Sequence, residues 1–349
     1  MRPRKTENRD LPPGMYRRKR QKANGKVWEA LYYRDKSGKD IFLGSDLVKA
    51  KLMWAELEAK SVPKELTTMK GIFDEYLLKI IPGKAARTQK DNIYELKQLR
   101  TVFDSAPIDA ITPAMIAQYR DSRSAKTRAN REIALLSHVF NTAREWGLTT
   151  RDNPCLGVRK NKEKPRDFYA NEAVWQAVYE EAPLELQDAM DLAYLTGQRP
   201  SDVLSMRKDD MEGIYLQVSQ GKTGKRLRIV LEVDGAKNSL GLLLERIMRR
   251  TSEHLSPFFI INEHGKRMSW PMLRNRWADA REAARVKAEV EKKPDLANRI
   301  AQFQFRDIRP KAASEINDLG EASVLLGHSK EGITERVYRR VGAIAKPSK

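Results

Sequence analysis

Cysteine and histidine are scarce in this sequence. Its 349 residues include one cysteine, Cys155, and four histidines. A single cysteine excludes an internal disulfide framework and fits a reducing compartment. Because Cys155 and the histidines show no spacing typical of metal ligands, we expect neither a metal centre nor another cofactor.

Long apolar runs are also missing. No stretch approaches the length that a membrane-spanning helix needs, and the basic N-terminus has no apolar segment of the signal-peptide type. We therefore expect a cytoplasmic protein with no membrane partner.

Negative charge is the third shortage. The sequence contains only 47 Asp and Glu but 66 Lys and Arg, which gives a formal net charge of +19. Such a surplus favours a polyanionic partner, with nucleic acid as the first candidate. The 40% of hydrophobic residues is enough for globular folding, and the length predicts two or three domains.

The first domain is expected at residues 1–62. Residues 15–21, 27–34 and 41–43 are short β-like runs, separated by turn signals at Asn24-Gly25 and Ser37-Gly38, and they predict a three-stranded meander followed by a helix over 47–60. The first strand carries four candidate DNA-binding cations: Arg17, Arg18, Lys19 and Arg20. Exposed Trp28, Tyr32 or Tyr33 could enter a DNA groove, or these aromatics could pack on the following helix.

Residues 63–152 are predicted to form an all-helical domain. One helix is expected from about Thr88 to Phe103, with Ile93, Leu96, Leu99 and Val102 facing inward. Thr112-Pro113 is a helix start signal. The last helix, over 126–146, opens with Lys126, Arg128 and Arg131. These cations either contact phosphates or form a solvated face.

A polar, proline-containing segment at 153–166 is expected to be a linker to a third domain at 167–349. Helices are predicted there at 172–180, 186–195, 240–250 and 273–290. Between them, residues 214–219 and 225–231 alternate between apolar and polar side chains, which predicts a β-hairpin with a lysine at its tip.

The third domain contains residue types suited to phosphate chemistry. Arg199 follows a Thr-Gly turn, and Asp202 is placed to hold its guanidinium. Arg306 and Arg309 are three apart, so on a helix they share a face. The other candidates are Lys222 at the hairpin tip, with Lys225 as its rival, His328 in a Leu-Gly-His triplet, and Tyr338 ten residues later.

Together these groups can cleave a phosphodiester without metal. Two fixed guanidinium groups can clamp the non-bridging oxygens and neutralise developing charge. A lysine can protonate the leaving oxygen, and a tyrosine can attack phosphorus and form a covalent ester.

In these motifs the chain resembles the tyrosine recombinase family, specifically temperate-phage integrases of the lambda type. The family pattern is Thr-Gly-x-Arg, a hairpin Lys, His-x-x-Arg, Leu-Gly-His and a terminal Tyr, which Arg199, Lys222, Arg309, His328 and Tyr338 match in order. The opening Arg9-Asp10-Leu11-Pro12-Pro13 and the strands after it resemble the family's arm-site-binding domain.

The resemblance implies a fold of three parts: a small N-terminal three-stranded β-sheet plus helix, an all-α core-binding domain and a mainly-α mixed α/β catalytic domain. The last two would close around duplex DNA. It also implies integration and excision by transesterification through a 3′-phosphotyrosyl intermediate, without metal or ATP. A homotetramer on paired attachment sites is implied as the working unit, with a host DNA-bending protein and an excisionase as helpers.

Two features depart from the family pattern. Arg306 stands where a histidine is usual, and because arginine stays charged it can donate hydrogen bonds but cannot shuttle a proton. Tyr338 lies one residue further from His328 than expected, which a loop such as 329–332 could absorb.

Three alternatives stay open: a DNA-binding architectural or regulatory protein without catalysis, a type IB topoisomerase, and a P-loop NTPase. The first would form no covalent adduct, and the second has no need of an arm domain. The third lacks the upstream glycine of its phosphate loop.

Overall fold

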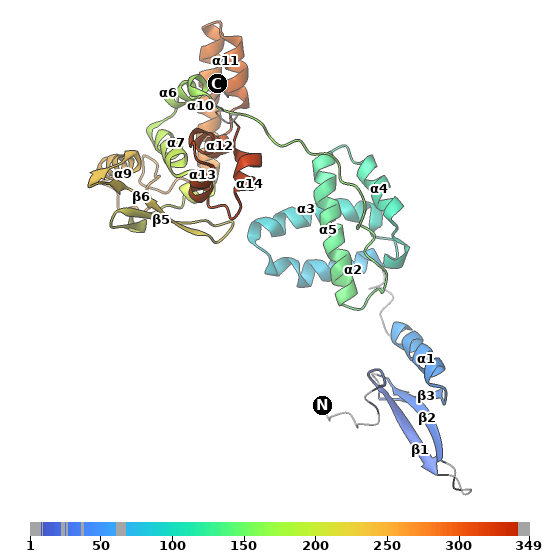
Figure 1. Cartoon of the computed structure of the whole chain (residues 1–349). Helices are drawn as coiled ribbons and strands as arrows, with labels where there is room; N and C mark the ends of the chain where they lie inside the picture. Colours follow the sequence, from blue (N-terminus) through green and yellow to red (C-terminus); the bar gives the residue numbers. More distant parts are fainter. Residues whose placement is uncertain are drawn as a thin grey trace, which may run out of the picture. The chain divides into compact units, whose positions relative to one another are not determined.

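The structure is a computed structural model that describes residues 8, 10–21, 25, 27–35, 38–60 and 68–340. The chain divides into two compact units, Met1–Glu163 and Lys164–Lys349, and the division falls inside the predicted linker 153–166 (Figure 1). Arg9 of the opening motif, Asn24 and Ser37 of the predicted turns, and the predicted domain end at 62 lie outside the described residues.

The first unit begins with the predicted antiparallel sheet. Its strands are β1 (Met15–Gln21), β2 (Val27–Arg34) and β3 (Asp40–Gly44), in the order β1-β2-β3, followed by helix α1 (Leu47–Lys60). Because side chains alternate along a strand, one sheet face packs with α1, and no described helix covers the other, open face. The packed face contributes Met15, Leu31 and Leu43 to a small core.

Tyr33 lies on the packed face of the sheet. It stands opposite Met15 in the strand register and is only 4% exposed. Of the two alternatives left open for these aromatics, Tyr33 therefore follows the second, because strand alternation turns it toward α1 while its neighbour Tyr32 faces outward.

The helical part comprises α2 (Met69–Lys79), α3 (Ala86–Phe103), α4 (Pro113–Ser122) and α5 (Lys126–Glu145) around one apolar core. The start signal before α4 is confirmed, since the Thr112 hydroxyl accepts a hydrogen bond from the Met115 amide at 3.3 Å.

The inward face of α3 differs from the prediction. Leu96 and Leu99 are buried as expected, but Ile93 and Val102 are 51% and 54% exposed. The buried stripe instead includes Asn92 and Glu95, which satisfy each other through a hydrogen bond of 3.0 Å between the Asn92 amide nitrogen and the Glu95 carboxylate. A paired polar group can be buried at little cost, so two polar residues occupy positions for which apolar ones were expected.

The second unit is mainly helical. Its helices are α6 (Glu172–Glu180), α7 (Leu184–Thr196), α8 (Pro200–Val203), α9 (Ser239–Arg250), α10 (Trp270–Val290), α11 (Pro294–Gln302), α12 (Ile308–Glu315), α13 (Leu319–Leu326) and α14 (Glu331–Ile333). Strands β4 (Met211–Glu212), β5 (Tyr215–Ser219) and β6 (Arg226–Val230) form one antiparallel sheet, and β7 (Glu232–Val233) pairs with β8 (Ala236–Lys237).

The core of this unit is centred on the fully buried ring of Phe303. Phe303, just after α11, has ring centroids of Trp277 at 4.9 Å and Phe168 at 6.0 Å. The ring therefore joins α10 to the segment that leads into α6, while the α10–α11 hairpin extends away from the rest of the unit (Figure 1).

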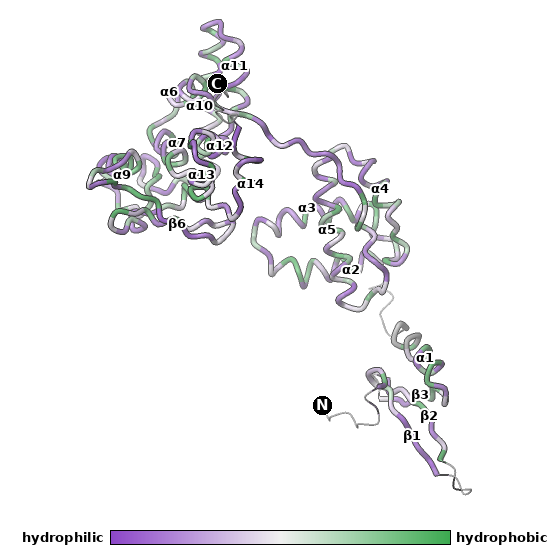
Figure 2. Tube along the Cα trace, in the orientation of Figure 1, coloured by the Kyte–Doolittle hydropathy of each residue, from purple (hydrophilic) through white to green (hydrophobic). Residues whose placement is uncertain are grey.

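The distribution of hydrophilic and hydrophobic residues differs between the first strand and the helices. Figure 2 shows β1 as almost wholly hydrophilic, whereas polar and apolar positions alternate along the helices. Within the described part of the chain, no helix is both long enough and apolar enough to span a membrane.

Candidate active site

Arg199 lies between α7 and α8 and is held by neutral and acidic partners. Gly197 ends α7 with a φ of 61°, a left-handed conformation that favours glycine. The Arg199 Nη1 atom donates to the side-chain oxygen of Gln220 at 3.2 Å and lies 3.7 Å from the Asp202 carboxylate. Asp202 also accepts from the Gly221 amide at 3.1 Å, so it joins Arg199 to the β5–β6 hairpin.

Arg309 follows the start of α12 and is only 3% exposed. Its Nη1 donates to the Gly197 carbonyl at 2.6 Å, and its Nη2 donates to the Leu326 carbonyl at 2.7 Å. Burial lowers the pKa of the Arg309 guanidinium, and repulsion from the Arg199 cation lowers it further. The buried Nε has no hydrogen-bond partner among the described residues.

His328 follows Gly327, which ends α13 in the left-handed region. Its Nε2 lies 3.2 Å from Arg309 Nη2, and its Nδ1 lies 2.7 Å from the Thr334 hydroxyl oxygen. Since a guanidinium can only donate, we assign Nε2 as an acceptor and the ring hydrogen to Nδ1. Burial, aided by repulsion from nearby cations, lowers the pKa of His328 to about 4, so the ring is neutral at pH 7.

Tyr338 ends a π-helical turn, Thr334–Tyr338. Its ring centroid lies 4.8 Å from that of His328 and 5.1 Å from the guanidinium carbon of Arg309. A π turn holds more residues than an α turn, which offers a place for the additional residue between His328 and Tyr338. The structure thus brings Arg199, Arg309, His328 and Tyr338 into one cluster.

The two hairpin lysines differ in what holds them. Lys225 donates to the His328 carbonyl at 3.2 Å and is half-buried. Lys222, at the hairpin tip, is exposed, and no group in the described part of the chain bonds to its amine. Lys225 therefore has a structural partner, whereas Lys222 is available to a ligand.

Arg306 differs from Arg309 in exposure. Arg306 is exposed in a short 3₁₀ turn, Phe305–Asp307, and α12 begins only at Ile308. The expectation that the two arginines share a helix face is wrong, because the change of helix type between them turns one outward and the other inward.

Sequence reasoning missed the groups that hold the cluster together. Gln220 and Thr334 bond directly to its members, and Gln198 accepts a hydrogen bond from Gln220. Only their positions in the sequence could have pointed to the two glutamines: Gln198 directly precedes Arg199, and Gln220 lies two residues before Lys222. Neutral amides carry no charge pattern that would single them out.

The predicted DNA-binding cations of β1 fall on two sheet faces. Arg17 pairs with Asp10 at 2.6 Å and with Glu29 at 3.0 Å, and Lys19 pairs with Glu29 at 3.6 Å. Arg18 lies on the other face, where its guanidinium covers the Tyr32 ring at 4.6 Å, and alternation places Arg20 on that face too.

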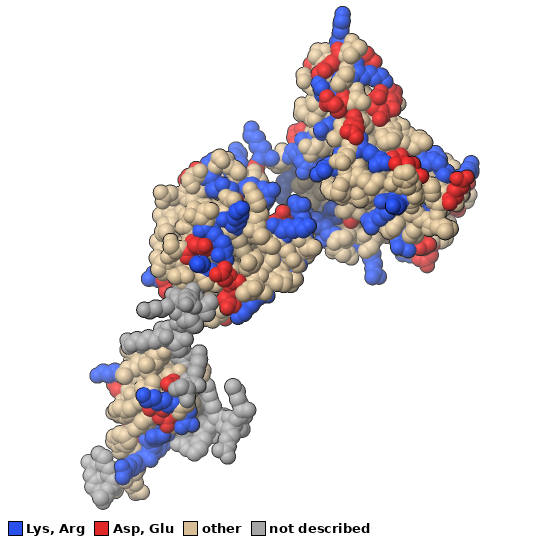
Figure 3. All heavy atoms as spheres, turned by 180° about the vertical axis from the view of Figure 1, so that it is seen from behind, with Lys and Arg blue, Asp and Glu red and all other residues tan. Residues whose placement is uncertain are grey.

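The predicted cations of α5 are partly engaged within their own unit. The Lys126 amine donates to the Asp121 carbonyl at 2.9 Å, and Arg131 pairs with Glu163 at 3.1 Å. Arg128 lies over the Tyr94 ring at 5.8 Å. On the face seen in Figure 3, Lys and Arg occur on the N-terminal sheet, the helical part and the second unit, and carboxylates are frequent on the α10–α11 hairpin.

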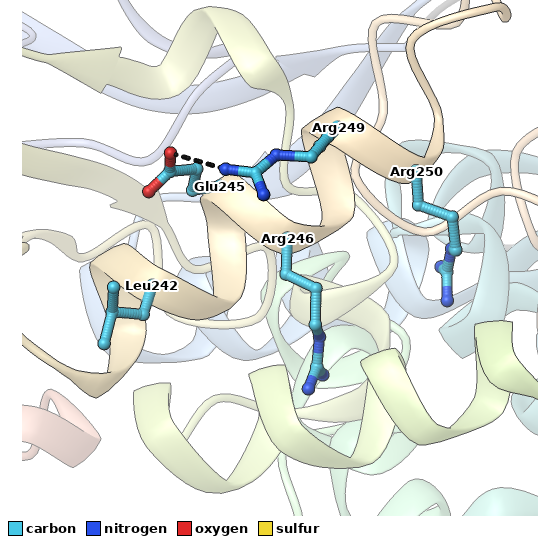
Figure 4. Close-up of a pocket in the computed structure, with 5 residues that line it drawn as sticks. All are labelled: Leu242, Glu245, Arg246, Arg249 and Arg250. Atoms are coloured by element: carbon cyan, nitrogen blue, oxygen red, sulfur yellow. Dashed lines mark hydrogen bonds and ion pairs between the residues drawn. The ribbon is translucent and has the colours of Figure 1, made fainter.

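A second group of arginines lies on α9 and provides a contrast. A hollow of about 410 Å³ is lined by Leu242, Glu245, Arg246, Arg249 and Arg250 (Figure 4). Arg246 pairs with Asp191 at 2.8 Å, Arg249 pairs with Glu245 at 3.1 Å, and Arg250 pairs with Asp188. These cations are neutralised by carboxylates, whereas Arg309 bonds to the carbonyls of Gly197 and Leu326 and to His328.

Comparison with known proteins decides the family. The family model "Phage integrase family" matches residues 170–343, and the model for the arm DNA-binding domain of bacteriophage lambda integrase matches residues 1–61. The integrase of Enterobacteria phage 434 is 30% identical over an alignment of 280 positions, which covers 73% of this chain and 74% of that protein. The chain belongs to the phage integrase family. It is a lambda-type, site-specific tyrosine recombinase.

Solved structures agree with this assignment in fold. A lambda integrase dimer bound to a COC′ core site has a TM-score of 0.63 and 23% identity, with 98% of this chain and 99% of that chain covered. A lambda integrase tetramer bound to a Holliday junction has a TM-score of 0.60 and 24% identity, with 93% and 97% covered. The predicted sheet, helical part and mainly helical catalytic part are confirmed.

The neutral state of His328 gives a testable titration. We expect its ring signals, assigned through a His328→Gln variant, to titrate in NMR with a midpoint about 4, below the ordinary 6.5. Because the folded-state pKa lies below that of the unfolded chain, the unfolded chain binds the proton more readily. This histidine's contribution to stability is therefore present above pH 6.5 and is lost as the pH falls toward 4. A midpoint at or above 6.5 would contradict the assigned hydrogen bonds.

Proposed function

We propose that Tyr338 is the nucleophile of this recombinase. Its hydroxyl oxygen attacks the scissile phosphorus, the bond from phosphorus to the 5′ oxygen breaks, and a 3′-phosphotyrosyl ester forms. The 5′-hydroxyl of the partner strand then reverses the ester in a second transesterification. The observation that carries this proposal is the packing of Tyr338 against both His328 and Arg309.

Arg199 and Arg309 are proposed to clamp the phosphate. Each would donate to non-bridging oxygens and stabilise the charge that builds up in the transition state. In support, the Arg309 Nε is a buried donor without a partner among the described residues, and no carboxylate lies within ion-pair distance of Arg309 there. Asp202 supports Arg199 rather than taking part in the chemistry.

Lys222 is proposed as the general acid that gives its proton to the 5′ oxygen. Its exposed position at the hairpin tip supports this role over Lys225, which is bonded to the His328 carbonyl. Arg306 and His328 would donate further hydrogen bonds to the phosphate. For His328 this requires that its Nε2 exchange the Arg309 contact for the phosphate and carry the ring hydrogen. The tyrosine proton leaves to water or to the phosphate, since arginine does not accept it.

The open face of the N-terminal sheet is proposed to contact arm DNA. It presents Arg18 and Arg20 beside Tyr32 and the exposed Phe42, and strands of this kind read DNA from within a groove. For the helical part, Lys126, Arg128 and Arg131 are proposed as phosphate contacts near the core site.

The working assembly is proposed to be a homotetramer on paired attachment sites. The solved tetramer of lambda integrase on a Holliday junction supports this state. A host DNA-bending protein and an excisionase are proposed as helpers, from the resemblance alone. Integration and excision of a phage genome in the bacterial cytoplasm would be the biological outcome.

Covalent trapping tests the chemistry. The protein is incubated in EDTA with a nicked duplex that carries its attachment core, and a labelled protein–DNA adduct is sought on a denaturing gel. We expect an adduct with the wild-type chain and none with Tyr338→Phe. The Arg199→Ala and Arg309→Ala variants should lose about 10²- to 10³-fold in rate. We expect Arg306→His to retain activity.

Intact DNA binding without an adduct would contradict the catalytic proposal and favour an architectural DNA-binding protein. Relaxation of supercoiled DNA without a core sequence would favour the type IB topoisomerase activity.

Salt dependence tests the sheet face. We expect Arg20→Ala to weaken binding to arm DNA and to reduce the slope of log affinity against log salt by about 0.9, because one phosphate contact is lost. Lys19→Ala is the matched control, since Lys19 lies on the opposite face and pairs with Glu29. Equal losses in both variants would show that overall charge, not this face, determines binding.

A further inference from the structure

Gln220 connects three elements of the site. It directly follows β5 and is fully buried. Its side-chain nitrogen donates to the Gln198 side-chain oxygen at 2.8 Å and to the Leu326 carbonyl at 3.0 Å. Gln198 in turn donates to the Leu325 carbonyl at 2.8 Å. A pair of amides therefore joins the hairpin to the end of α13, just before His328.

The orientation of the Gln220 amide is fixed by its partners. Its oxygen accepts from Arg199 Nη1 at 3.2 Å and from the Thr223 hydroxyl at 2.7 Å. A flipped amide would set its NH₂ group against the Arg199 cation and its oxygen against the oxygens of Gln198 and Leu326, neither of which can donate to it. The Gln220 oxygen thus accepts hydrogen bonds from both Arg199 and Thr223, the residue next to Lys222.

The surroundings leave little freedom for this arrangement. A Cβ atom on Gly327 would lie 2.6 Å from the Gln220 side-chain nitrogen. The hairpin is closed by main-chain hydrogen bonds of 2.8 Å from the Gln220 amide to the Lys225 carbonyl and from the Gly224 amide to the Gln220 carbonyl. Lys222 therefore sits in a short loop whose base is fixed, and the Thr223 hydroxyl fixes its tip.

We propose that Thr223 is a positioning residue for protonation of the leaving group. Its hydroxyl, bonded to the Gln220 oxygen, sets the hairpin tip relative to Arg199, so that the Lys222 amine reaches the 5′ oxygen of the phosphate that Arg199 holds. This inference rests on the proposed role of Lys222 as the general acid. The alternative is that Thr223 only stabilises the turn.

A sulfur substitution distinguishes these roles. In a duplex with a 5′-bridging phosphorothiolate, the bond from phosphorus to sulfur breaks and sulfur leaves as a thiolate. A thiol has a pKa of about 8.5, so this leaving group needs no proton from a general acid. A variant that impairs only protonation regains its rate on the sulfur substrate, whereas a variant with a damaged site stays slow on both.

The test measures single-turnover cleavage of oxygen and sulfur substrates by the full-length chain, at DNA concentrations that saturate binding. On the oxygen substrate we expect Thr223→Val to be slower by about three- to tenfold, the value of one hydrogen bond. On the sulfur substrate it should match the wild type, and Thr223→Ser should be normal on both. Thr223 is exposed, so the valine variant should fold normally.

Lys222→Ala serves as the reference. It should lose about 10²- to 10⁴-fold on oxygen and recover on sulfur. Failure of Lys222→Ala to recover would refute Lys222 as the general acid, and this inference with it. If Lys222→Ala recovers, normal oxygen cleavage by Thr223→Val, or equal slowing on both substrates, would overturn the role of Thr223 alone.

Discussion

The site depends on one constraint: it places two positive charges, those of Arg199 and Arg309, close together in a partly buried region. Burial and mutual repulsion both act against the Arg309 cation, as its lowered pKa reflects. The chain meets this cost with neutral acceptors, mainly the carbonyls of Gly197 and Leu326 and the amide oxygen of Gln220. Asp202 offsets part of the Arg199 charge at 3.7 Å, but the other partners are neutral, so the pair retains much of its attraction for a phosphate.

A second carboxylate, that of Asp307, lies in the segment just before Arg309. Asp307 is fully enclosed and accepts from Arg166 at 2.7 Å and from Arg340 at 3.1 Å. Arg340 lies two residues after Tyr338, so this buried group ties the tyrosine segment to the turn before α12 and to the residues that lead into α6. Negative charge therefore supports the scaffold, while the face that would meet DNA stays positive.

The sequence predicted those features that depend on local pattern. Alternation and turn residues predicted the strand at 15–21, and motif order predicted the cluster around Arg309. Burial of individual side chains was harder, because Tyr33 is turned inward by the packing of α1 and Ile93 is displaced from the core by a satisfied polar pair. The role of Gln220 could not be predicted, since it arises only when three distant segments meet.

The central claim is that the arginine pair acts by neutralising one phosphodiester, and a change in phosphate charge tests it most directly. Replacing a non-bridging oxygen at the scissile position by a methyl group makes that phosphate neutral. Cleavage rates would be compared for the wild type and Arg309→Ala on the normal and methylphosphonate duplexes. We predict that the loss caused by Arg309→Ala is at least about tenfold smaller on the neutral substrate, because less charge then needs stabilisation. An equal loss on both substrates would contradict the account.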